Sequence, residues 1–128
     1  MTPTPTSPQP TAIVLLGHGS RDPLWQVPIQ NLAERIRSTH DGMTVSIAFL
    51  EWAEPDLLQA VGSLVAAGHR RIRLLPLFFG MGKHAREDLP QLVETLTHQH
   101  PALELEVLPS AGEQTQVLDL LARLALAN

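Results

Sequence analysis

The stretch TAIVLLGHGS, Thr11 to Ser20, decides the fold, because its apolar run ends abruptly in glycines that flank a histidine. A second stretch, RIRLLPLFFGMGKH, Arg71 to His84, has the same arrangement. Short apolar runs bounded by turn residues predict buried strands, and glycine permits a sharp turn after such a strand. Longer helical patterns separate these runs, so the sequence predicts a parallel α/β sheet.

Strand-like and helical patterns alternate along the rest of the chain and predict four βα units. The expected strands are residues 11–16, 43–50 and 103–108, with the third strand starting at Ile72. The expected helix starts lie at Asp22-Pro23, at Pro55 and at the Asp88/Gln91 pair, and a last helix holds Val117, Leu118, Leu121 and Leu124. Right-handed crossovers predict a doubly wound, flavodoxin-like sheet of strand order 2-1-3-4.

Composition narrows the possible functions. The chain has 128 residues, so we expect one domain at 11–128 after a flexible Pro/Thr-rich tail at 1–10. Zero cysteines exclude disulfides and thiolate metal sites. A net charge of -4 with 4% aromatic residues argues against nucleic-acid binding. No apolar run reaches the roughly 20 residues of a membrane span, and the start lacks signal-peptide features, so we expect a cytoplasmic protein without membrane contact.

Two histidines mark the predicted site. His18 and His84 follow the first and third expected strands, which the order 2-1-3-4 places side by side. The carboxyl ends of such neighbouring strands form ligand clefts, and neutral imidazoles bind metal ions and accept protons. A lone loop histidine most often only forms a hydrogen bond, but the pair favours a joint role in metal chemistry. We expect structural roles for His40, His69, His98 and His100.

Glu51 directly follows the second expected strand, within the segment Phe49 to Pro55. This position makes it a candidate third ligand at the same edge of the sheet. A carboxylate is also favourable at a helix start, so Glu51 or Glu54 could instead cap the following helix. Position alone leaves both interpretations open.

Other side chains flank the histidines. Four apolar residues precede His84 and form either core or the lining of a pocket for a flat ligand: Leu77, Phe78, Phe79 and Met81. Three basic residues lie beside the two histidines and are either solvated surface or recognition sites for carboxylate or phosphate: Arg21, Lys83 and Arg86.

Three motifs in order carry a family resemblance: LLGHGSRDP at 15–23, FLEWAEP at 49–55 and PLFFGMGKHAREDLP at 76–90. Together they resemble the CbiX/SirB family of sirohydrochlorin chelatases. The length is similar to that of the short, single-domain form, which works as a homodimer. The resemblance implies a class II chelatase, a lyase that needs neither ATP nor an organic cofactor.

The resemblance also implies a substrate and site residues. A divalent metal, Co²⁺, Fe²⁺ or Ni²⁺, would be inserted into the anionic tetrapyrrole sirohydrochlorin for cobalamin, sirohaem or a nickel coenzyme. His18 and His84 would handle the metal, with Glu51 as a catalytic helper. The macrocycle would contact Ser20, Arg21, Leu77, Phe79, Met81, Gly82 and Lys83.

Alternatives from other classes remain. A non-catalytic carrier of a metal or tetrapyrrole would share this sequence pattern. A histidine-phosphatase-like hydrolase is discounted, because Gly17 stands where an arginine would hold phosphate. A receiver domain is discounted as well, because the first strand ends without the acidic pair that binds magnesium.

Overall fold

A four-stranded parallel sheet in the order β2-β1-β3-β4 forms the centre of the molecule. The computed structural model describes residues 11–127, and the predicted tail at 1–10 lies outside the described residues. The strands are β1 (Thr11–Gly17), β2 (Thr44–Phe49), β3 (Arg71–Pro76) and β4 (Glu104–Val107). The predicted fold class and strand order are therefore confirmed. β1 and β3 are neighbours, paired from Thr11 with Arg71 to Leu16 with Pro76.

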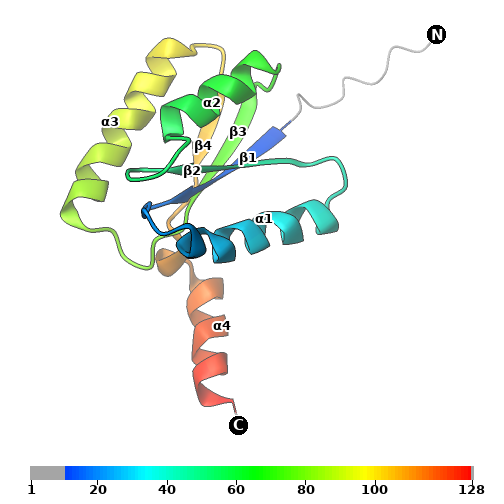
Figure 1. Ribbon diagram of the computed structural model, residues 1–128, viewed down its shortest axis with the longest axis vertical. Coiled ribbons are helices and arrows are strands. Elements are labelled where there is room, and N and C mark those ends of the chain that lie inside the picture. The colour runs from blue at the N-terminus through cyan, green and yellow to red at the C-terminus, as the bar shows by residue number, and fades with distance from the viewer. Residues whose placement is uncertain (1–10, 128) are drawn as a thin grey trace.

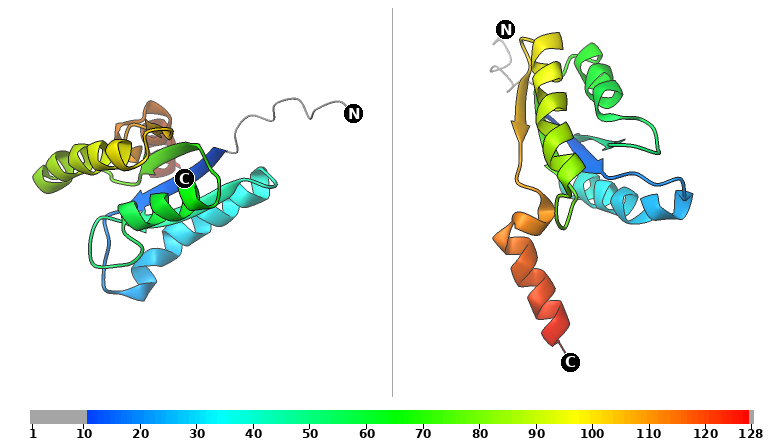
Figure 2. Two further views of the ribbon diagram at one scale, coloured as in Figure 1. Left: turned by 90° about the horizontal axis from the view of Figure 1, so that it is seen from above. Right: turned by 90° about the vertical axis from the view of Figure 1, so that its left-hand side faces the viewer.

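Helices cover the two faces of the sheet unequally (Figure 1). On one face α1 (Val27–Thr39) packs against β1 and β2, after the short 3-10 helix η1 (Pro23–Gln26). On the other face lie α2 (Leu57–Ala66) and α3 (Lys83–Gln99). A second 3-10 helix, η2 (Ala111–Glu113), leads into α4 (Thr115–Leu126). Figure 2 shows α4 projecting away from the sheet and from the other helices.

The central strand β1 is buried on both sides, as expected for a parallel sheet between helices. Ala12, Val14 and Leu16 pack into the cluster formed with α2 and α3. Leu15 packs on the opposite side, with Ile29 and other residues of α1. Within residues 11–127, no helix has the length and apolar character that crossing a bilayer requires.

The start of α2 differs by two residues from the predicted start at Pro55. The Asp56 carboxylate accepts the backbone N–H of Gln59 at 2.8 Å, and the Gln59 side chain accepts the backbone N–H of Asp56 at 2.9 Å. This reciprocal capping box fixes the first turn of α2. Gly68, which has a φ of +100°, lies just after the end of α2 and closes this helix, as the sequence pattern predicts.

The predicted capping box at Asp88 and Gln91 is wrong. α3 begins at Lys83, directly after Gly82, and therefore contains Asp88, Gln91 and Pro90 in its interior. Proline inside a helix removes one backbone hydrogen bond, to the carbonyl four residues earlier. Both Pro90 and Arg86 are exposed, so water can satisfy that carbonyl. The helix consequently continues through a position that the sequence pattern marks as a start.

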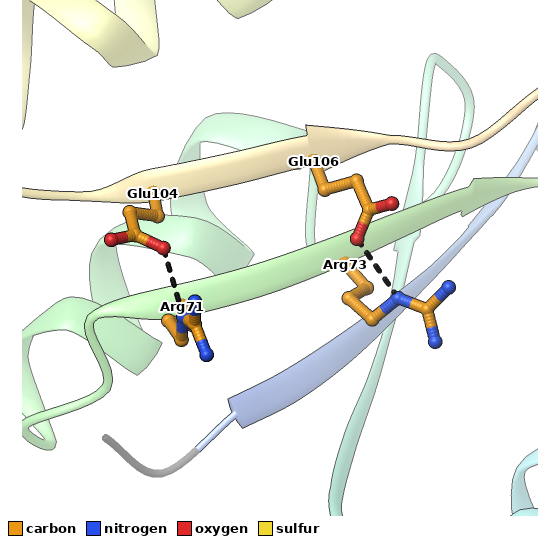
Figure 3. Close-up of polar contacts among 4 residues, drawn as sticks. All are labelled: Arg71, Arg73, Glu104 and Glu106. Carbon is orange, nitrogen blue, oxygen red and sulfur yellow. Dashed lines mark hydrogen bonds and ion pairs between the residues drawn. The ribbon is translucent and has the colours of Figure 1, made fainter. Parts of the chain in front are cut away.

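Charged pairs cross from β3 to β4 on the same face of the sheet as α1, beyond the strands β1 and β2 that α1 covers (Figure 3). Arg71 Nε donates to Glu104 Oε2 at 2.8 Å, and Arg73 Nε donates to Glu106 Oε1 at 3.1 Å. The hydrogen bond to Glu104, and then its negative charge, raise the pKa of Arg71 above its ordinary value. This part of the sheet therefore has a charged rather than an apolar surface.

Candidate functional site

His18, Glu51 and His84 line one cleft of about 330 Å³. His18 directly follows β1 and Glu51 is the second residue after β2, and with Leu50 they form one wall. The other wall is α3, which begins one residue before His84. The structure thus brings the three predicted catalytic residues together at the carboxyl edge of the sheet, where parallel α/β sheets form their sites.

His18 and Glu51 form a direct pair. His18 Nε2 lies 3.1 Å from Glu51 Oε1, and the two side chains are 53% and 51% exposed. The His18 ring also meets the buried Phe78 ring edge-on, with 6.2 Å between the centroids. Because Asp56 caps α2, the alternative that Glu51 or Glu54 caps this helix is wrong. The Glu51 carboxylate is directed to the histidine instead.

The backbone after β1 and β2 holds this pair in place. Leu50 N–H donates to the Gly17 carbonyl and Glu51 N–H donates to the His18 carbonyl, each at 3.1 Å. Gly19 has a φ of +112°, and a Cβ there would lie 1.6 Å from the Glu51 carbonyl oxygen. Only glycine permits both this backbone conformation and this close approach. The glycine after His18 is therefore a requirement of the site's geometry.

Three polar residues of α3 line the same cleft without having been predicted: Asp88, Gln91 and Thr95. They lie four, seven and eleven residues after His84, and this spacing puts them on one helical face with it. Sequence reasoning missed them because it assigned Asp88 and Gln91 to a helix start. If the helix had been predicted to start at Lys83, the helical period alone would have placed these three residues on the same face as His84.

The seven predicted macrocycle-binding residues lie elsewhere, and none is among the residues lining this cleft. Leu77 packs on the α1 side of the sheet, whereas Met81 packs against the core on the α2 and α3 side. Phe79 is 73% exposed. The Ser20 hydroxyl accepts the backbone N–H of Asp22 at 3.0 Å.

Two of the basic residues near the histidines, Arg21 and Lys83, also lie outside the cleft lining. The Arg21 guanidinium lies over the Trp52 ring, 4.2 Å from its centroid, which is a cation–π contact. Gly82 is the residue before the first turn of α3, and Lys83 is its first residue. Gly82 and Lys83 are thus the two residues that precede His84 in the chain, but neither lines the cleft.

The candidate ligands do not surround a single point. Among residues 11–127, no group of three or more His, Cys, Asp or Glu side chains is arranged to hold one metal ion. The His18–Glu51 pair and His84 instead stand on two walls of an open cleft. This arrangement offers nitrogen and oxygen donors to an ion and leaves space between the walls.

The chain is similar to several known proteins. It is 36% identical over 82 residues to a sirohydrochlorin cobaltochelatase of Methanococcus aeolicus, a match covering 64% of this chain and 57% of the relative. The match therefore spans less than two thirds of that relative's length. The CbiX protein of Marinobacter aquaeolei has a similar structure, with a TM-score of 0.77, 31% identity, and coverage of 91% of this chain and 94% of that one.

A second structure, SirB from Bacillus subtilis with Fe³⁺, has a TM-score of 0.71 and 25% identity, and covers 85% of this chain and 43% of that one. The CbiX family model matches residues 12–127. This match extends over nearly all of the described residues and confirms the resemblance carried by the three sequence motifs. The protein belongs to the CbiX family.

Proposed function

We propose that this protein is a lyase that inserts a divalent metal ion into sirohydrochlorin without ATP or an organic cofactor. The observation that carries the proposal is that the His18–Glu51 pair and His84 line the same cleft. Imidazole and carboxylate are ligands for Co²⁺, Fe²⁺ and Ni²⁺ and are also proton acceptors. The name of the Methanococcus relative supports the same reaction.

Metal insertion needs metal binding and proton acceptance at the same place. Insertion exchanges two pyrrole N–H protons of the macrocycle for one divalent ion, so charge and atoms balance when both protons leave. An imidazole whose Nε2–H donates to the Glu51 carboxylate keeps Nδ1 as an acceptor for a proton or a metal. His18 then offers its one free nitrogen either as a metal ligand or as a proton acceptor, Glu51 holds its ring and stabilises the protonated imidazole, and His84 provides a donor on the opposite wall.

The binding of the macrocycle remains part of the proposal. Sirohydrochlorin is a flat ring carrying many carboxylates, and Arg21 and Lys83 supply positive charge next to the two histidines in the chain. The exposed Phe79 offers an apolar surface for the ring. We retain Ser20, Met81 and Gly82 as predicted contacts, whereas Leu77 packs on the α1 side of the sheet, opposite to Met81. The cleft itself would then receive the centre of the ring, where the metal enters.

The proposed unit is a homodimer of one domain per chain, comprising residues 11–128. A macrocycle larger than the cleft needs further walls, and a second copy supplies them through closed two-fold symmetry. Static light scattering at micromolar protein concentration measures this state directly.

An insertion assay tests the function. Purified protein is mixed with sirohydrochlorin and Co²⁺, Fe²⁺ or Ni²⁺ in turn, and the absorbance change of the metallated ring is followed. We expect acceleration above the solution rate with at least one ion, and loss of that acceleration in the His18→Ala/His84→Ala double variant. The metal inserted fastest indicates whether the product serves cobalamin, sirohaem or a nickel coenzyme. Binding of sirohydrochlorin without acceleration would instead identify a carrier.

A further inference from the structure

An arginine and a tryptophan join the two loops that follow β1 and β2. The Arg21 guanidinium lies over the Trp52 ring, 4.2 Å from its centroid. Trp52 directly follows Glu51 in the chain. Arg21 lies three residues after His18, the other member of the cleft pair. The stacked pair therefore adjoins the cleft residues of both loops, although neither of its members lines the cleft.

Trp52 has a backbone conformation that a bulky side chain rarely adopts. Its φ is 69°, and among residues 11–127 no other residue with a side chain has a positive φ. The side chain is 56% exposed, so burial of the ring offsets only part of the strain. Strain of this kind persists where the surrounding structure fixes the backbone, and it is found most often at functional sites. Here the hydrogen bond from Glu51 N–H to the His18 carbonyl fixes the preceding residue.

A purely structural role does not account for the stacked pair. The two loops are already joined by the His18–Glu51 contact and by two backbone hydrogen bonds. An exposed cation–π contact stabilises a protein by less than a strained backbone conformation commonly costs. The strained tryptophan is explained better by its effect on Arg21.

The hydrogen-bond donors of Arg21 are free to bind a ligand. Arg37, Arg71 and Arg73 each pair with a glutamate, whereas no carboxylate within residues 11–127 pairs with Arg21. Stacking on Trp52 uses the flat face of the guanidinium, and its N–H groups lie in the plane of the group, at its edge. A carboxylate can therefore accept two of these N–H groups while the stacking persists.

The loop that carries Arg21 is held as well. The Ser20 hydroxyl accepts the backbone N–H of Asp22 at 3.0 Å, and the Asp22 carboxylate accepts the backbone N–H of Leu24 at 3.0 Å. With its backbone fixed and an aromatic ring under its guanidinium, Arg21 loses less conformational entropy when it binds a ligand. Such pre-organisation strengthens binding without adding a contact.

We propose that Trp52 is a positioning residue, whose ring holds Arg21 ready to bind a peripheral carboxylate of the macrocycle. The proposal rests on the proposed function and names the residue that makes Arg21 effective. A macrocycle centred on the cleft extends beyond it, and its carboxylates then reach the loops around the cleft. The planar donor edge of an arginine matches the two oxygens of a carboxylate. Trp52 itself acts only through Arg21.

Equilibrium dialysis of the full chain against metal-free sirohydrochlorin tests the positioning. We expect Arg21→Ala and Trp52→Ala each to raise Kd by about tenfold, the usual loss of a hydrogen bond between charged groups. The double variant should raise Kd no further than Arg21→Ala does, because the effect of Trp52 requires the arginine. Arg35→Ala is the matched control for the lost charge, since Arg35 is exposed on α1, and it should leave Kd unchanged.

Three substitutions of Trp52 separate positioning from folding. Trp52→Phe keeps an aromatic face and should keep Kd within about threefold of the unmodified value. Trp52→Gly lacks the ring but tolerates the positive φ, so it should unfold at a higher urea concentration than Trp52→Ala. Both variants without the ring should nevertheless bind equally weakly. Affinity that follows stability, with the glycine variant binding as the unmodified chain does, would show that Trp52 acts on the fold alone.

Kinetics provide a second measurement. In the insertion assay Arg21→Ala and Trp52→Ala should raise KM for sirohydrochlorin, because a peripheral contact is made equally in the ground state and the transition state. His18→Ala should lower kcat instead. A lower kcat with an unchanged KM in the Trp52 variant would overturn the proposal.

The remaining outcomes separate this proposal from the proposed function. A further rise in Kd when Trp52→Ala is added to Arg21→Ala would refute the positioning, because Trp52 would then contact the macrocycle itself. An unchanged Kd in either single variant would also refute it and leave the chelatase standing. Binding of sirohydrochlorin without accelerated insertion would refute the chelatase, and the Kd values would still decide the positioning. An unmodified chain that does not bind sirohydrochlorin would refute both.

Discussion

The His18 Nε2 atom lies 3.1 Å from Glu51 Oε1, although the two residues follow different strands of the sheet. β1 and β2 are paired in parallel up to Gly17 with Phe49, and the two backbone hydrogen bonds beyond this register continue the pairing. The side chains that follow the strands are consequently held opposite each other. In a histidine and a carboxylate so arranged, the carboxylate stabilises the imidazole when it accepts a proton, and the proposed metal insertion requires proton acceptors.

We expect His18→Ala and His84→Ala each to reduce the insertion rate by about 10²-fold or more, the usual contribution of a positioned acid–base group. Both histidines are exposed at element ends, so the thermal unfolding midpoint should stay unchanged. The insertion assay measures the rate, and His98→Ala is the control, because His98 is 81% exposed on α3 and outside the cleft. Undiminished turnover in both variants would contradict the assignment of the site.

Glu51→Gln should slow insertion by about tenfold, less than the loss of either histidine. Glutamine keeps an oxygen near His18 Nε2 but removes the negative charge that stabilises a protonated imidazole. Glu54→Gln, three residues along the chain from Glu51 and outside the cleft lining, should insert metal at the unmodified rate. Equal rates for the Glu51 variant and the unmodified chain would leave Glu51 without a role in the reaction.

Gly19→Ala should destabilise the protein by at least about 2 kcal/mol, because the new Cβ meets the Glu51 carbonyl and a residue with a side chain is strained at this positive φ. Insertion should fall as well, since the backbone that holds His18 must shift. Gly80→Ala is the control, because a Cβ there meets nothing within 4 Å. Urea denaturation of the two variants measures the difference, and equal midpoints would be inconsistent with the close approach.

Asp88→Asn should slow insertion while leaving stability unchanged. Asp88 lines the cleft on the same face of α3 as His84, and it does not cap the helix. Loss of a helix cap costs about 1 kcal/mol, so a cap at Asp88 would be visible in urea denaturation. Glu87→Gln, the adjacent exposed residue outside the cleft lining, controls for the change of charge. A stability loss with normal insertion would restore the capping interpretation.

Asp56→Ala should lower the free energy of unfolding by about 1 kcal/mol, because its carboxylate accepts the Gln59 backbone N–H in the first turn of α2. Glu54→Ala should have no measurable effect on stability, since it makes no capping contact to α2. Both values come from urea denaturation. A larger loss for Glu54 than for Asp56 would show that the cap has been assigned to the wrong residue.

The sequence by itself determined the sheet and the position of the site. Apolar runs such as residues 11–16 can be stable only when buried on both faces, and handed crossovers leave few strand orders open. Because carboxyl ends of neighbouring parallel strands meet at one edge, His18 and His84 could be placed at one cleft before any distance was known.

Tertiary structure decided between interpretations that the local sequence patterns had left open. Glu51 and Asp56 both stand before α2, and only the direction of each carboxylate separates the partner of His18 from the helix cap. Asp88 and Gln91 fit a capping box in isolation, but α3 extends back to Lys83, and the capping spacing becomes a polar face of the cleft. Leu77 and Met81 lie on opposite sides of the sheet, although alternation along an extended strand would put residues four apart on the same side. Both residues follow the end of β3 at Pro76, so the loop that leads to α3 sets their directions.

The apolar pattern of α4 likewise predicted a helix but not its surroundings. Val117, Leu118, Leu121 and Leu124 are compatible with packing on the sheet of the same chain, since a period records only that one face is apolar. The close contact of Gly112 with Phe79 turns the helix outward. Period and composition depend on neighbours along the chain, whereas the direction of a helix depends on contacts between residues far apart in it, and those exist only once the chain has folded.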